Sequence, residues 1–195
     1  MLLRAIACVA LLVASAHARQ PAPAELPALY AALEESDAVV EGSAMPKKVL
    51  YVFFDANCWY CHLTWKALQV YEKAGLHVRW VPVAYQKDSS TTKAAAIMQA
   101  KDRVAALREN ETGYRAESYD GGIVPAKASK PLQAQLKANF QLMDRFGVSG
   151  TPGLVWKDAR GRVQVRTGMP RLSQLPAITG LPEQKIDDPE LTEFR

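Results

Sequence analysis

Two apolar runs bracket a helical pattern in the first half of the chain. Val49 to Phe54 is continuously apolar, which is typical of a buried strand, whereas His77 to Tyr85 alternates and is rich in β-branched and aromatic residues. Between them, apolar residues at helical spacing form two stripes, one of Leu63, Ala67, Val70 and Ala74 and one of Cys61, Trp65 and Leu68. The pattern predicts a strand-helix-strand unit with neighbouring strands, the core of an α/β fold.

A long helical region follows this unit. From Asp88 to Phe146 the pattern predicts an alanine-rich helix, a restart after Asp102 and a last helix from about Pro131. Tyr119 to Ser129 contains two glycines and a proline, and predicts a loop before the last helix.

The C-terminal part is expected to add a hairpin and a short helix. Leu154 to Lys157 and Arg162 to Arg166 flank the turn 158–161 and predict two short paired strands. Residues 171–180 predict a final short helix, and the acidic tail 183–195 is expected to be mobile.

Residues 1–18 have the pattern of a secretory signal peptide. Arg4 precedes an apolar stretch from Ala5 to Ala14, and Ala16-His17-Ala18 is a small-residue cleavage signature. The apolar stretch is too short for a typical membrane span, which needs roughly 20 apolar residues. We therefore expect an exported protein. Its mature chain is expected to begin with an N-terminal arm, residues 19–45, that contains a short helix.

Charge patterning argues against a nucleic-acid partner. The 195 residues carry a formal net charge of +4 at pH 7, and basic positions such as Lys101 and Arg108 alternate with acidic ones such as Asp102 and Glu109. This is an ordinary solvated face. The length favours one domain, which the pattern places at residues 46–182.

Cys58 and Cys61 form a Cys-x-x-Cys pair at the start of the predicted helix, and Cys8 would be lost with the signal peptide. Two sulfurs at this spacing can close and reopen a small disulfide ring, while the helix end stabilises the attacking thiolate. A structural bridge across so short a loop contributes only about 2 kcal/mol. A redox pair is therefore favoured over a structural bridge, with a metal or haem site as the remaining interpretation.

His62 keeps alternatives from other classes open. The string Cys58-x-x-Cys61-His62 matches the c-type haem attachment pattern, and two thiolates with an imidazole also suit copper. The strand directly before the motif argues against haem. A further alternative is a protein that binds unfolded chains without redox chemistry. The redox interpretation itself requires no cofactor and no metal.

The order strand, Cys-x-x-Cys at a helix start, strand, helical insert, Thr-Pro turn and hairpin resembles the thioredoxin superfamily. More narrowly, the sequence resembles the catalytic domain of the DsbC/DsbG family of periplasmic thiol:disulfide interchange proteins. The resembling segments are Tyr51 to Asp55, Tyr60 to His62, the insert at about 88–146, and Gly147 to Pro152. The resemblance covers about residues 45–182. It implies an α/β, thioredoxin-like fold with a helical insertion between the strand-helix-strand unit and the hairpin after a cis proline.

Two features depart from this family. Its members have an additional N-terminal dimerisation domain and a linker helix, whereas only a short segment separates the expected cleavage site from the first predicted strand. Trp59 also stands where the family usually has a small residue or proline. We therefore expect a monomer, and favour reduction or oxidation of selected proteins over general isomerisation.

The predicted site centres on the two cysteines and a Thr-Pro step. By their order along the helix, Cys58 is expected at the exposed N-terminal end as the nucleophile, and Cys61 one turn inward as the resolving thiol. The resemblance implies a cis bond between Thr151 and Pro152, placed against the cysteines. It also implies that the backbone of Thr151 faces an extended substrate segment.

Four further positions carry two interpretations each. Asp55 either assists electrostatics and proton transfer near Cys58 or is a turn residue. Trp59 and Tyr60 either offer an apolar lip to unfolded chains or shield the disulfide. His62 either influences the thiolate or is a solvated surface residue.

The sequence therefore predicts a periplasmic thiol:disulfide oxidoreductase whose substrates are exported proteins with thiols or disulfides. The resemblance implies a membrane electron donor of the DsbD type for a reductase, or a DsbB-like partner for an oxidase. The direction of exchange depends on these partners.

Overall fold

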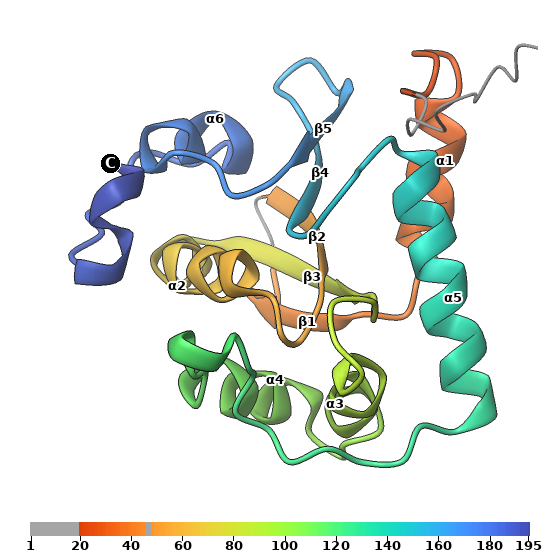
Figure 1. Ribbon diagram of the computed structural model, residues 1–195. Coiled ribbons are helices and arrows are strands. Elements are labelled where there is room, and N and C mark those ends of the chain that lie inside the picture. The colour runs from red at the N-terminus through yellow and green to blue at the C-terminus, as the bar shows by residue number, and fades with distance from the viewer. Residues whose placement is uncertain (1–19, 46–47) are drawn as a thin grey trace, which may run out of the picture.

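The computed structural model describes residues 20–45 and 48–195. Its centre is a five-stranded sheet of order β1-β3-β2-β4-β5 with helices on both faces (Figure 1). The strands are β1 (Val39–Gly42), β2 (Lys48–Phe54), β3 (Leu76–Pro82), β4 (Gly153–Lys157) and β5 (Val163–Thr167). The predicted signal peptide lies outside the described residues.

The predicted strand-helix-strand unit is confirmed. The chain runs from β2 through α2 (Trp59–Lys73) into β3, which pairs with β2 in parallel, with Val52 opposite Trp80. β4 pairs antiparallel with the other edge of β2, and β5 completes the predicted hairpin. The sheet therefore has the predicted thioredoxin-like arrangement, in which α2 begins beside the carboxyl end of β2.

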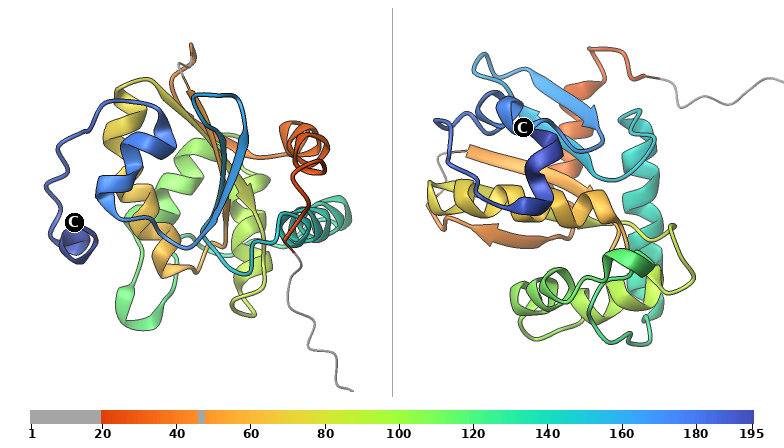
Figure 2. Two further views of the ribbon diagram at one scale, coloured as in Figure 1. Left: turned by 90° about the horizontal axis from the view of Figure 1, so that it is seen from above. Right: turned by 60° about the vertical axis from the view of Figure 1, so that its left-hand side comes forward.

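Alternation along β2 divides the core into two layers. Leu50, Val52 and Phe54 face a cluster that includes α2 and α6 (Leu175–Thr179), while Tyr51 and Phe53 face the other side. On that second side α1 and α5 cover the sheet, as the view from above shows (Figure 2). Because both faces are covered, β2 carries the continuous apolar run that the sequence displays.

The predicted helical insert consists of α3 (Ser90–Met98), α4 (Arg103–Thr112) and α5 (Lys130–Arg145). The side chain of Asp102 caps α4 by accepting a hydrogen bond from the Ala105 N–H at 2.9 Å. The segment between α4 and α5 contains one 3₁₀ turn at Ala116–Ser118 and is otherwise a loop, as predicted. In the described part of the chain, no helix has the length and apolar character needed to cross a membrane.

α1 (Leu26–Glu34) is the short helix expected in the N-terminal arm, whereas β1 was not predicted. β1 is a four-residue edge strand that pairs antiparallel with β3. It contains the buried Glu41, whose carboxylate accepts hydrogen bonds from Trp65 Nε1 at 3.0 Å and Arg108 Nε at 2.6 Å. A charged residue at a buried position breaks the apolar alternation by which so short a strand would be recognised. Its burial is possible because Trp65 and Arg108, which lie far away in the sequence, pair with it.

The segment predicted as a mobile tail instead packs against α2. A 3₁₀ helix at Pro189–Phe194 lies beside α2 and fully buries Leu191 (Figures 1 and 2). Lys66 on α2 forms ion pairs with Glu190 and, at 2.8 Å, with Asp188. The acidic residues that led us to expect a mobile tail therefore form ion pairs with a basic residue of α2.

Candidate active site

Cys58 is the N-cap of α2. β2 ends at Phe54, a turn follows, and Cys58 has the extended backbone typical of an N-cap, with φ −81° and ψ 114°. Its Sγ accepts a hydrogen bond from the Cys61 N–H at 3.2 Å, and its carbonyl accepts from the N–H groups of Cys61 and His62. The sulfur therefore occupies the end of the helix where backbone N–H groups lack intrahelical partners and favour an anion.

The two thiols have opposite pKa shifts. Burial acts to raise the pKa of Cys58, but its hydrogen bonds with Cys61, Thr151 and Gln86 outweigh the effect of burial, so the pKa is lowered. For Cys61, burial raises the pKa well above the ordinary value, and the hydrogen bond to Cys58 and the charge on that sulfur raise it further. The surroundings therefore favour the thiolate at Cys58 and the protonated thiol at Cys61.

Cys58 is less accessible than the sequence predicted. Its exposed fraction is 2%, whereas we expected an exposed sulfur at the helix end. The insert supplies nearby cover, because Tyr114 donates a hydrogen bond to the carbonyl of Asn57 at 2.8 Å and its ring lies 5.6 Å from that of Trp59. The prediction considered α2 alone and omitted the insert.

The Thr151-Pro152 peptide bond is cis and lies against Cys58, as the resemblance implied. The Cys58 thiol donates a hydrogen bond to the carbonyl oxygen of Thr151 at 3.3 Å. The structure thus places Cys58 beside the Thr151-Pro152 step, although 93 positions separate Cys58 from Thr151 in the sequence.

Asp55 serves as an anchor for the turn. Its carboxylate is buried and accepts hydrogen bonds from the backbone N–H groups of Asn57, Tyr85 and Gln86 and from the hydroxyl of Ser90, at 2.8 to 3.1 Å. Four donors match the roughly four lone-pair positions of a carboxylate. This geometry favours the turn interpretation over proton transfer near the thiols.

Tyr85 and Gln86 belong to the site, although the sequence analysis did not single them out. The hydroxyl of Tyr85 accepts a hydrogen bond from the Thr151 N–H at 3.0 Å, and the Gln86 amide donates to the Thr151 hydroxyl at 2.8 Å. They follow β3, which runs parallel to β2, so they emerge at the sheet edge where the cysteine turn lies. The predicted pairing of these two strands could therefore have indicated that residues after β3 reach the site.

Trp59 and Tyr60 point to different surroundings. Trp59 is half-buried, with its ring centroid 5.4 Å from that of His62. Tyr60 is exposed, and its ring meets Phe194 edge-on at 6.3 Å. Trp59 therefore packs toward the insert, and Tyr60 leaves apolar surface at the rim.

His62 is buried, so its interpretation as a solvated surface residue was wrong. Its ring stacks on Tyr114 at 4.7 Å, while Nδ1 lies 3.4 Å from Glu111 and Nε2 lies 3.7 Å from Glu190. The residues that cover His62 belong to α4, the loop after it and the C-terminal segment. No contact between α4 and α2 was predicted, and the C-terminal segment was expected to be mobile. Across residues 20–45 and 48–195, no group of three His, Cys, Asp or Glu side chains is arranged to hold a metal ion.

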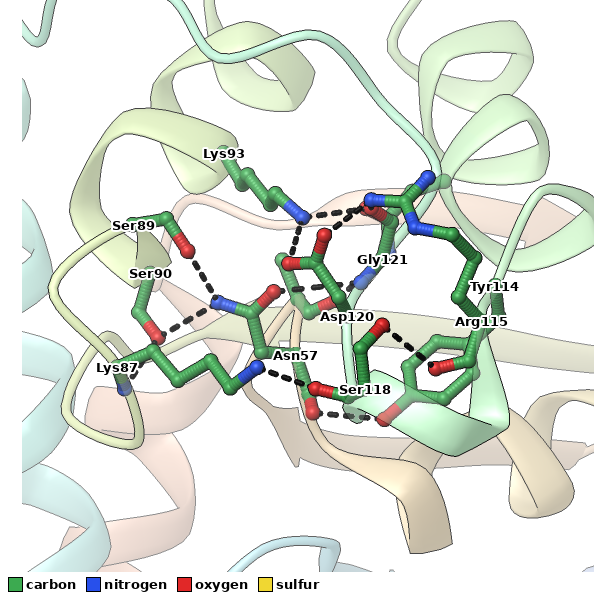
Figure 3. Close-up of polar contacts among 12 residues, drawn as sticks. Asn57, Lys87, Ser89, Ser90, Lys93, Tyr114, Arg115, Ser118, Asp120 and Gly121 are labelled. Atoms are coloured by element: carbon green, nitrogen blue, oxygen red, sulfur yellow. Dashed lines mark hydrogen bonds and ion pairs between the residues drawn. The ribbon is translucent and has the colours of Figure 1, made fainter.

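A polar network joins the turn before Cys58 to the insert (Figure 3). The side-chain amide of Asn57 donates to the hydroxyls of Ser89 and Ser90, both at 3.1 Å, and its oxygen accepts from the Gly121 N–H at 3.2 Å. Lys93 donates to the carbonyl of Gly121 at 2.6 Å and pairs with Asp120. The insert therefore holds the cysteine turn from its outer side.

Sequence comparison identifies the family. The thioredoxin-like domain model matches residues 36–178, so the chain belongs to this family. Among similar proteins, the thiol:disulfide interchange protein DsbG of Pseudomonas aeruginosa is 31% identical over 154 residues, which are 78% of this chain and 59% of DsbG. DsbC of Haemophilus influenzae is 32% identical over 123 residues, 62% of this chain and 49% of DsbC. The matched part thus spans about three fifths of that DsbG and half of that DsbC.

Solved structures support the same fold. A periplasmic thioredoxin-like protein from Salmonella enterica serovar Typhimurium has a TM-score of 0.63 and 22% identity, covering 78% of this chain and 94% of that protein. The catalytic domain of Proteus mirabilis ScsC has a TM-score of 0.57 and 21% identity, covering 81% of this chain and 96% of that domain. Both the predicted fold and the resemblance to DsbC and DsbG are confirmed.

Proposed function

We propose that the protein is a thiol:disulfide oxidoreductase that exchanges disulfides with exported proteins through Cys58 and Cys61. The observation that carries this proposal is the pair of thiols in the first turn of α2, with the Cys58 sulfur 3.2 Å from the Cys61 N–H and the two pKa values shifted in opposite directions. A lowered pKa increases the fraction of thiolate at a given pH and also makes the sulfur a better leaving group.

The exchange proceeds in two displacements. The Cys58 thiolate attacks one sulfur of a substrate disulfide, a new S–S bond forms, and the other substrate sulfur leaves with the bonding electron pair and takes up a proton. Cys61 then loses its proton and attacks the Cys58 sulfur. This step closes the Cys58–Cys61 disulfide and releases the second substrate sulfur as a thiol. The reverse sequence oxidises a substrate dithiol.

Substrate recognition is proposed at the step before the cis proline. The backbone of Thr151 lies beside the attacking sulfur, since its carbonyl oxygen is 3.3 Å from Cys58 Sγ. An extended substrate segment that pairs with this backbone as an added strand brings its own cysteine to Cys58. Tyr60, exposed at the rim, offers apolar contact to the same segment.

Compartment and partners are part of the proposal. Similar proteins carry the name thiol:disulfide interchange protein, which supports exported proteins with thiols or disulfides as substrates. We propose a periplasmic location and a monomer. The redox partner is a membrane reductant of the DsbD type or a DsbB-like oxidant. Light scattering of the purified protein tests the monomer.

Substitution of each cysteine tests the exchange chemistry. Cys58→Ala removes the attacking sulfur and should abolish reduction of insulin by dithiothreitol-regenerated protein. Cys61→Ala removes the resolving sulfur and should accumulate substrate joined to Cys58, measured by mass spectrometry. Wild-type activity in both variants would refute the assignment. Haem absorbance in the Soret region of purified protein would instead support the haem alternative.

A further inference from the structure

Both backbone polar groups of Thr151 are already occupied. Its N–H donates to the hydroxyl of Tyr85 at 3.0 Å, and its carbonyl oxygen accepts a hydrogen bond from the Cys58 thiol at 3.3 Å. A substrate strand that pairs with Thr151 needs these same two groups. While Cys58 is protonated, both backbone groups of Thr151 that a substrate strand would use are therefore occupied within the free protein.

The reaction releases only one of the two groups. As a thiolate or in a mixed disulfide, Cys58 has no S–H proton, so the carbonyl of Thr151 loses its partner when the chemistry begins. Tyr85 takes no part in the exchange, and its hydroxyl keeps the N–H of Thr151 occupied. The substrate backbone must displace this hydroxyl, because one N–H cannot make two full-strength hydrogen bonds.

Hydrogen bonds hold the backbone of Tyr85, and open space lies beside its side chain. The N–H groups of Tyr85 and Gln86 both donate to the carboxylate of Asp55, at 2.8 and 3.1 Å. Tyr85 is 43% exposed, and its ring meets Phe140 edge-on at 5.5 Å. The ring also borders a hollow of about 350 Å³, otherwise lined by Ala84, Thr91, Gln133, Leu136, Lys137 and Phe140.

We propose that Tyr85 is a specificity-determining gate, which competes with polypeptide substrates for the N–H of Thr151. The inference rests on the proposed thiol:disulfide exchange. An extended peptide segment displaces the Tyr85 hydroxyl to pair with Thr151, and this competition lowers its rate. A small disulfide without a peptide backbone reacts with Cys58 without needing that N–H. The gate therefore distinguishes polypeptide substrates from small disulfides.

Removal of one oxygen atom isolates this effect. Tyr85→Phe keeps the ring against Phe140 and removes the hydroxyl, which is the competing acceptor and also lies 3.2 Å from the Thr151 hydroxyl. The hydrogen bond from Gln86 to the Thr151 hydroxyl at 2.8 Å remains, so the loop before Pro152 keeps a second attachment.

The experiment uses Cys61→Ala protein, in which the mixed disulfide on Cys58 accumulates. One probe is a ten-residue peptide whose single cysteine is joined to 2-mercaptoethanol, and the other is bis(2-hydroxyethyl) disulfide. Adduct formation on Cys58 is followed by mass spectrometry. Tyr85→Phe should increase the peptide rate by about fivefold, the equivalent of one net hydrogen bond, and change the small-disulfide rate less than twofold. The matched control is Tyr119→Phe, which removes an exposed hydroxyl.

Two outcomes would overturn the gate. An unchanged or slower peptide rate in Tyr85→Phe means that the hydroxyl does not compete, and an equal change with both probes means that it acts on Cys58. Amide exchange at Thr151 gives an independent readout, because loss of the Tyr85 oxygen should accelerate it in the free protein. Unchanged exchange would also refute the gate. Failure of the parent protein to react with either probe would instead refute the proposed function.

Discussion

At the residue scale, the difference in pKa between the two neighbouring thiols arises from the groups that contact each sulfur. Cys58 Sγ receives the Cys61 N–H and lies at the helix end, while Cys61 lies one turn inside α2 among buried apolar residues. Burial disfavours the thiolate at both positions, but only Cys58 has enough hydrogen-bond donors to reverse that effect.

This difference predicts selective alkylation of the reduced protein. Iodoacetamide reacts with thiolates, so Cys58 should label at a pH below the ordinary cysteine range, about 8.5, and Cys61 only well above it. Labelling across pH 5 to 10, read by mass spectrometry, measures both profiles. Because each of the single variants Cys58→Ala and Cys61→Ala keeps one thiol, they show which labelling profile belongs to which cysteine. Similar midpoints for the two thiols would contradict the prediction.

Glu72 predicts a pH dependence of stability away from the thiols. Burial, together with the charge of Glu41, raises its pKa from 4.5 to about 8, against the opposing effect of Arg108. The folded state therefore keeps a proton that the unfolded chain loses above about pH 4.5. Its stabilising effect is complete below that pH and is lost as the pH rises toward 8.

The measurement is the free energy of unfolding in urea between pH 5 and pH 9. Glu72→Gln removes the ionisation and should remove a decrease on the order of a few kcal/mol over this range. Glu109→Gln, on the exposed side of α4, serves as the control and should leave the decrease intact. An identical pH profile for wild type and Glu72→Gln would refute this assignment.

At the element scale, the turn between β2 and α2 depends on the insert. Asn57 is buried, and its side chain joins the start of α3 to the loop around Gly121 (Figure 3). A buried amide with three partners is costly to remove, since each partner left unsatisfied costs about 1–3 kcal/mol. The network thus couples the position of Cys58 to residues far along the chain.

Asn57→Ala should therefore reduce both stability and exchange activity. We expect the free energy of unfolding to fall by about 2–3 kcal/mol and the rate of insulin reduction to fall as well, because the turn before Cys58 loses its support. Urea unfolding and the insulin assay measure the two effects. Gln141→Ala, an exposed amide on α5, is the control. Unchanged stability would show that the network does not hold the turn.

The elements that were predicted well are those whose own residues show the apolar period of a strand or a helix. β2, α2 and the β4–β5 hairpin each display their apolar period, and the resemblance added the cis bond before Pro152. β1 was missed because its one charged residue, Glu41, is paired by residues from other elements. Tyr85 was missed for a similar reason, since its contact with Thr151 spans 66 positions.

At the scale of the whole molecule, the C-terminal segment closes over α2. Leu191 has no exposed surface, Glu190 lies 3.7 Å from His62, and Phe194 meets Tyr60. The segment therefore touches the helix that carries both thiols, at Tyr60 within the Cys-x-x-Cys motif and at His62 directly after it. Its apolar anchor, rather than its exposed charges, should supply most of the attachment energy, because exposed ion pairs contribute about 0–1 kcal/mol.

Leu191→Ala tests whether the segment is part of the folded core. Loss of a fully buried leucine side chain removes its transfer free energy and leaves a cavity, so the free energy of unfolding should fall by about 2–5 kcal/mol. Urea unfolding measures this as a lower midpoint with an unchanged slope. Glu193→Ala, an exposed neighbour in the same 3₁₀ helix, should shift the midpoint little. Equal midpoints for Leu191→Ala and wild type would mean that the segment is a loose tail, as its acidic sequence first indicated.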